Sequence, residues 1–70
     1  MVPVWEVYVV KQTRDMEDYE AHVRYHRKVE DAMRHWKDAG GFQNGYGIRL
    51  ALAKPEWIKE DEQNAKKNKD

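Results

Sequence analysis

Apolar residues gather in separate segments of this chain, and their spacing within each segment predicts a strand or a helix. Residues 2–10 are rich in valine and aromatic side chains, which favour a β-strand. Alternation places Trp5, Val7 and Val9 on one face of this strand. Apart from Glu6, the other face is apolar too, so the strand needs more cover than one helix provides.

Residues 15–39 have the spacing of one long amphipathic helix. Thr13 or Asp15 is expected to cap its start, and Gly40 and Gly41 to end it, because glycine readily adopts the left-handed conformation that follows a helix C-terminus. The opposite face carries charges of alternating sign. The residues expected on the apolar side are Ala21, His22, Tyr25, His26, Val29, Ala32, Met33 and Trp36, with Tyr19 and Val23 at its edge.

Residues 46–53 alternate large apolar residues with small or charged ones, which predicts a second strand after a turn at Asn44 and Gly45. Pro55 suits the first turn of a short C-terminal helix, and Trp57 and Ile58 give that helix its apolar contacts. Residues 60–70 are almost wholly polar and are expected to form a frayed or disordered tail. Residues 1–59 are therefore predicted to form a single small domain.

The predicted fold class is α+β, a strand–helix–strand unit with one long amphipathic helix and a short C-terminal helix. A helix that crosses over the sheet makes the two strands parallel. A sheet of only two strands is not stable by itself, and a chain of 70 residues without cysteine has neither a large core nor disulfides. We therefore predict that a homodimer completes the fold.

Charge and composition narrow the classes of function. The chain has 13 Lys and Arg against 13 Asp and Glu, so it lacks the strong positive field that drives sequence-independent binding of nucleic acids. The absence of cysteine excludes cysteine nucleophiles and fits a reducing compartment, so a cytoplasmic location is expected. No segment approaches the length of a membrane span, and no membrane contact is predicted.

His22 and His26 are the first candidates for chemistry. On a helix their spacing places two imidazoles on one face, within reach of one metal ion. Two ligands are too few for a metal site, so no metal or cofactor is predicted, and we expect the histidines to pack and form hydrogen bonds at a core or an interface. Two alternatives stay open, namely metal ligands completed by another segment or subunit, and a pH-sensitive element in an apolar seam.

Two tyrosines support an alternative function. Residues 7–9 (VYV) and 45–47 (GYG) resemble the two strand motifs of RNA-recognition-motif domains, in which exposed aromatic residues on neighbouring strands stack bases. The resemblance implies that Tyr8 and Tyr46 bind single-stranded nucleic acid. The neutral net charge disfavours this function.

No catalytic grouping is evident, and Glu6 and Arg49 are expected to form a cross-strand ion pair. We predict a small non-enzymatic interaction module, an adaptor, inhibitor or regulator, that binds another protein as a homodimer. The alternatives are the nucleic-acid binder and a small enzyme with a histidine-containing site at a dimer interface. The residues predicted to form the interface or binding surface are Tyr8, Tyr19, His22, His26, Met33, Trp36, Tyr46 and Trp57.

Overall fold

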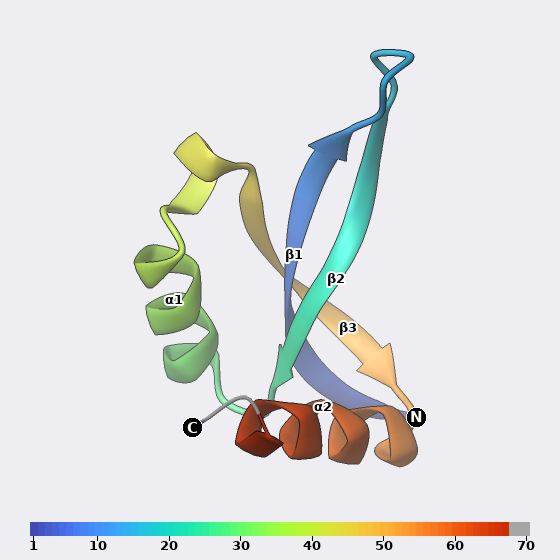
Figure 1. Ribbon diagram of the computed structural model, residues 1–70. Helices are drawn as coiled ribbons and strands as arrows, with labels where there is room; N and C mark the ends of the chain where they lie inside the picture. The colour runs from blue at the N-terminus through green and yellow to red at the C-terminus, as the bar shows by residue number, and fades with distance from the viewer. Residues whose placement is uncertain (68–70) are drawn as a thin grey trace.

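The fold consists of three strands and two helices, as the computed structural model of the chain describes it for residues 1–67 (Figure 1). The α+β class predicted from the sequence is confirmed, and so are both predicted strands. In chain order the elements are β1 (Val2–Gln12), β2 (Asp18–His26), α1 (Val29–Asp38), a 3-10 turn (Gly41–Asn44), β3 (Tyr46–Ala53) and α2 (Pro55–Lys67).

The prediction of one helix over residues 15–39 is wrong in its first half. Asp18–His26 forms β2, and only Val29–Asp38 is helical. Residues 19–25 alternate aromatic or aliphatic side chains with charged or histidine side chains, so their spacing also fits a strand. The N–H of Thr13 donates to the carbonyl of Glu17 (2.9 Å), and Thr13 Oγ1 accepts from the N–H of Glu17 (3.2 Å). Thr13 thus closes a β1–β2 hairpin where a helix cap was expected.

The three strands form one antiparallel sheet in the order β2-β1-β3. A helix that crosses over the sheet would have made β1 and β3 parallel, but they are antiparallel because β2 leads the chain back along β1 before α1 begins. β1 is the central strand, and its residues are apolar on both faces because α2 packs near Val4 on one face and α1 packs on the other. β2 also supplies the third strand that was expected to come from a second copy.

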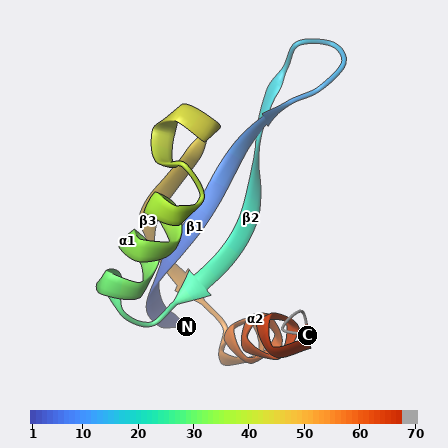
Figure 2. The same cartoon turned by 60° about the vertical axis from the view of Figure 1, so that its left-hand side comes forward.

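The two helices cover different faces of the sheet (Figure 2). α1 packs against the face that carries the fully buried Val7, and Trp36 Nε1 donates to the carbonyl of Tyr46 at 2.8 Å. α2 lies across the other face, near the start of β1 and the end of β3. There Ile58 packs with Val4 and Ala53 in a buried core.

A β-bulge in β2 decides where its histidines point. The register between β1 and β2 shifts between Val7 and Tyr8, so Val23 is an extra residue in β2. Side chains alternate between faces along a strand, and one extra residue reverses the alternation. His22 therefore points to the face covered by α2 and His26 to the face covered by α1. The prediction that they share one side is wrong.

The ends of the helices follow the residues that mark them in the sequence. α1 ends before Gly40, whose φ of 107° is one that glycine adopts readily. α2 begins at Pro55, as predicted, and continues to Lys67. It includes residues 60–67 of the predicted tail, and residues 68–70 lie outside the described part of the chain.

No helix within residues 1–67 is long and apolar enough to span a membrane.

Replacing Ile58 by alanine tests how α2 is attached to the sheet. Ile58 is 1% exposed, so we expect Ile58→Ala to lower the free energy of unfolding by about 2–4 kcal/mol, through lost burial and the cavity left behind. Urea denaturation at pH 7 measures the change. The exposed neighbour gives a control, Lys59→Ala, with an expected change below about 0.5 kcal/mol. An equally small effect at Ile58 would show that α2 does not pack on the sheet.

Candidate functional site

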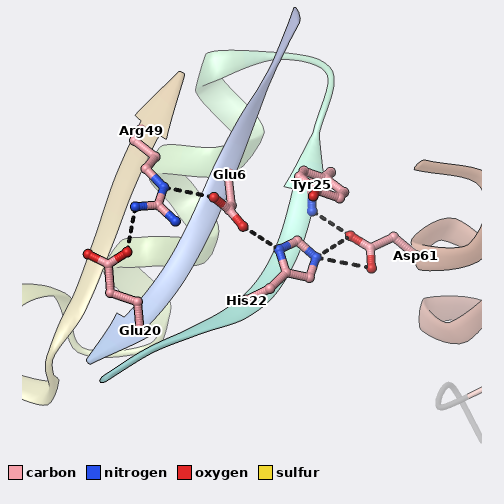
Figure 3. A network of polar contacts seen from close by, with 6 residues as sticks. All are labelled: Glu6, Glu20, His22, Tyr25, Arg49 and Asp61. Atoms are coloured by element: carbon pink, nitrogen blue, oxygen red, sulfur yellow. Dashed lines mark hydrogen bonds and ion pairs between the residues drawn. The ribbon is translucent and has the colours of Figure 1, made fainter. Parts of the chain in front are cut away.

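A buried carboxylate lies at the centre of the sheet. Glu6, on the middle strand β1, is only 6% exposed. Arg49 Nε donates to Glu6 Oε1 from β3 at 2.8 Å, and His22 Nδ1 lies 2.6 Å from Glu6 Oε2 on the side of β2 (Figure 3). The predicted cross-strand ion pair between Glu6 and Arg49 is confirmed. Each carboxylate oxygen thus has a partner from a different neighbouring strand.

The contacts continue outward on both sides of Glu6 (Figure 3). The second donor of Arg49, Nη1, lies 2.6 Å from Glu20 Oε1. On the other side, His22 Nε2 lies 3.0 Å from Asp61 Oδ2 on α2. The same Asp61 oxygen accepts the backbone N–H of Tyr25 at 2.6 Å. One network of polar contacts therefore joins all three strands to α2.

The network fixes the charge of its two central members. Burial alone would raise the pKa of Glu6, but the hydrogen bonds and positive charges of Arg49 and His22 outweigh it and hold that pKa below its usual value. Hydrogen bonds to Glu6 and Glu20 raise the pKa of Arg49. Because the folded-state pKa of Glu6 is depressed, its contribution to stability is present above its unfolded pKa and is lost as the pH falls through the folded pKa.

Both ring nitrogens of His22 face carboxylates, those of Glu6 and Asp61. A carboxylate only accepts hydrogen bonds, so both contacts form together when both nitrogens carry protons. With both ring nitrogens directed at carboxylates, neither nitrogen of His22 is directed at a site for a metal ion or a substrate. The arrangement favours a structural clamp that joins β1, β2 and α2 over a catalytic group. Within residues 1–67, no cluster of three or more His, Asp or Glu side chains is placed to hold a metal ion.

The second histidine of β2 belongs to a separate pair on the opposite face. His26 Nε2 and His35 Nδ1 lie 2.9 Å apart, so one ring donates and the other accepts. Burial, followed by the positive charges of His35 and Arg24, lowers the pKa of His26. Burial and the charge of Arg24 lower the pKa of His35. Protonating both rings removes the acceptor, so acid breaks this hydrogen bond.

Tyr8 and Tyr46 lie on adjacent strands but do not share a surface. Tyr8 pairs with Gly47 and Tyr46 pairs with Val9, so alternation puts the two rings on opposite faces of the sheet. The guanidinium carbon of Arg49 lies 4.4 Å from the centre of the Tyr8 ring. The structure therefore does not bring the two rings together as one platform for stacked bases.

The other predicted interface residues are spread over several elements. Tyr19 on β2, Met33 on α1 and Trp57 on α2 are 47%, 56% and 42% exposed. Trp36 packs edge-on against Phe42, with ring centres 5.0 Å apart. Of the predicted set, the structure brings His22 and Trp57 together, because both line a hollow between β2 and α2.

The two outer edges of the sheet differ. On β2, the extra residue Val23 interrupts the regular pairing edge, and Asp61 occupies the outward N–H of Tyr25. Within residues 1–67 no further strand lies beside β3, which contains neither lysine nor proline to discourage pairing. The bulge and Asp61 therefore protect the part of the β2 edge around residues 23–25, whereas β3 carries neither feature.

The backbone groups at the open edge can be assigned from the register. The N–H of Val10 donates to the carbonyl of Gly45 at 2.8 Å, so alternation turns the N–H and C=O groups of residues 47, 49 and 51 toward β1. Those of Ile48, Leu50 and Leu52 then point outward. The side chains of Leu50 and Leu52 are each 63% exposed. We use the name β3 edge for these three residues.

Asp61, Tyr25 and Glu20 are members of the network that the sequence did not indicate as site residues. Asp61 lies 39 positions from His22, in a polar run where nothing local distinguishes one carboxylate from another. Glu20 and Tyr25 were assigned to a helix, which separated them from Glu6. The alternation of residues 19–25 was the one signal that places them on a strand beside β1.

Comparisons of the chain with protein-family models, with curated proteins and with solved structures found no match. Its function is therefore inferred from contacts, exposure and charge.

Substituting Glu6 tests whether the buried carboxylate holds the network together. Glu6→Gln keeps the shape but removes the charge shared by Arg49 and His22, so we expect the free energy of unfolding to fall by roughly 2–3 kcal/mol at pH 7. Glu20→Gln is the matched control, because Glu20 also contacts Arg49 but its side chain is 51% exposed. Its effect should stay below about 1 kcal/mol. Equal losses in urea denaturation would contradict a special role for Glu6.

Titration of the histidine pair tests the electrostatics of the α1 face. NMR signals of His26 and His35 should titrate with midpoints below the ordinary pH 6.5, because burial and Arg24 disfavour the charged rings. With depressed folded-state pKa values, the contribution of the pair to stability is complete above pH 6.5 and is lost as the pH falls below it. Midpoints at or above 6.5 would contradict the burial of the pair.

Proposed function

We propose that this protein is a small non-enzymatic interaction module that acts by pairing its β3 edge with a strand from another protein chain. The observation that carries the proposal is the contrast between a β2 edge that is partly protected, around residues 23–25, and an open β3 edge. Unpaired N–H and C=O groups along an edge strand are a template for pairing with another chain. Leu50 and Leu52 add apolar area that such pairing removes from water.

A second copy of the chain is the simplest source of the added strand. Antiparallel pairing of two β3 strands about a twofold axis at Leu50 sets Ile48 of each copy opposite Leu52 of the other. The residues of the β3 edge in one copy then lie opposite apolar residues of the β3 edge in the other. Arg49 falls opposite the small Ala51 instead of a second arginine, so no like charges are placed face to face. These features support a homodimer with one continuous sheet.

The alternative functions have weaker support. A histidine-based enzyme needs a free ring nitrogen, and both nitrogens of His22 are taken by carboxylates. Binding of single-stranded nucleic acid needs an aromatic platform and positive charge. Tyr8 and Tyr46 lie on opposite faces of the sheet, and the chain has equal numbers of basic and acidic residues. The proposal includes a cytoplasmic location, since a chain without cysteine needs no oxidising compartment for disulfides.

A lysine at position 50 tests the proposed interface. Sedimentation velocity over a concentration series should show a dimer of the wild-type protein. Leu50→Lys should weaken the dimerisation constant at least about tenfold, because burial of a leucine contributes about 1.5–3 kcal/mol and the substitution acts in both copies. Phe42→Lys is the control, since Phe42 is 79% exposed but lies outside the β3 edge.

Three results decide the matter. Retained dimers in Phe42→Lys with loss in Leu50→Lys support pairing at the β3 edge. A wild-type protein that remains monomeric at every concentration contradicts the homodimer. Equal weakening by both substitutions contradicts the β3 edge as its interface.

A further inference from the structure

A hollow of about 390 Å³ lies between β2 and α2, on the side of α2 that faces the network. Its position follows from the contacts of Asp61, which tie α2 to the outward edge of β2. The hollow is open to solvent along one side, so a side chain from outside can enter it. The residues that line it are His22, Tyr25, Trp57, Glu60, Asp61 and Asn64.

Two aromatic rings form part of the lining. Trp57 is 42% exposed, although large aromatic side chains are usually covered in a folded chain. Lys54 Nζ lies 5.6 Å from the centre of the Trp57 ring, so this ring already attracts one positive charge of the chain itself. Tyr25 contributes the second ring and packs at 4.2 Å, centre to centre, against His22.

Negative charge accompanies the rings. Glu60 and Asp61 supply two carboxylates to the lining, and Asn64 adds an amide. The pKa of Tyr25 is raised first by burial and then by the negative charges of Glu6 and Asp61, with a smaller opposing effect of Arg49. His22 contacts the carboxylates of Glu6 and Asp61, and Glu60 is a further carboxylate of the lining that His22 does not contact.

We infer that the hollow between β2 and α2 binds the ammonium or guanidinium group of a basic side chain presented by a partner protein. Aromatic faces attract cations, and a neighbouring carboxylate adds a charge-assisted hydrogen bond. An anionic group would be repelled by Glu60 and Asp61, and a purely apolar one would leave the charge of Glu60 without a partner in the lining. That the cation comes from a partner protein rests on the proposed function. Binding of a cation in the hollow does not require the β3 edge.

Titrations with small capped amino acids test this inference directly. Nα-acetyl-lysine methylamide is added to 15N-labelled protein, and its norleucine counterpart, which lacks the ammonium group, is added in parallel. We expect the lysine derivative to shift the Trp57 indole signal and the amide signals of Tyr25 and Asn64, with at least about threefold tighter binding than the norleucine derivative. n-Butylammonium shows whether a free amine binds as well as a peptide side chain.

Substitutions on α2 provide the matched comparison. Glu60→Gln removes a charge from the lining and should weaken binding of the lysine derivative at least about threefold. Glu56→Gln removes the same charge from the first turn of the same helix, outside the lining, and should leave binding unchanged. Trp57→Leu should weaken binding while leaving the fold intact, because the ring is partly exposed.

The outcomes separate this inference from the proposed dimer. Binding that persists in Leu50→Lys supports a site that is independent of the β3 edge, even if the dimer is disproved. Absence of binding in wild-type protein overturns the inference and leaves the dimer untouched. Equal affinity for lysine and norleucine derivatives, or equal loss in Glu56→Gln and Glu60→Gln, also overturns it. Tighter binding of n-butylammonium than of the capped lysine would overturn the assignment to a protein side chain.

Discussion

The burial of one carboxylate, that of Glu6 in the middle of the sheet, constrains the arrangement of the whole molecule. An ionised group taken out of water is costly unless it is paired and hydrogen-bonded. Here each oxygen has its own partner, Arg49 from one neighbouring strand and His22 from the other. The observed register, in which β2 and β3 flank β1, meets this requirement. It also positions α2, because His22 in turn needs Asp61.

The bulge at Val23 divides the polar chemistry of the chain between the two faces. One histidine of β2 joins the carboxylate network under α2, and the other forms a pair with His35 under α1. Acid acts on both arrangements in the same direction. It removes the charge of Glu6 and also protonates the histidine pair, so each contribution to stability declines as the pH falls.

Local patterns predicted β1, β3, the second half of the long helix and the start of α2, because each has one dominant period or a clear end signal. They failed for β2, because the spacing of residues 19–25 fits both a helix and a strand. Pairing with β1 makes this segment a strand. The ion pair of Glu6 and Arg49 was predictable once two strands were assumed to be neighbours. The bulge and the contact of Asp61 with His22 were not, because register and helix docking depend on distant parts of the chain.

The inequality of the two sheet edges has a consequence for how far assembly can go. Fibres and other open-ended β-structures grow because every added chain exposes a fresh edge for the next one. In this sheet, Asp61 and the bulge protect part of the β2 edge, so a chain that docks on β3 through its own β3 strand presents only partly protected β2 edges outward. Such an arrangement favours a finite pair over polymerisation, a safeguard for a protein that keeps leucine residues exposed on an edge strand.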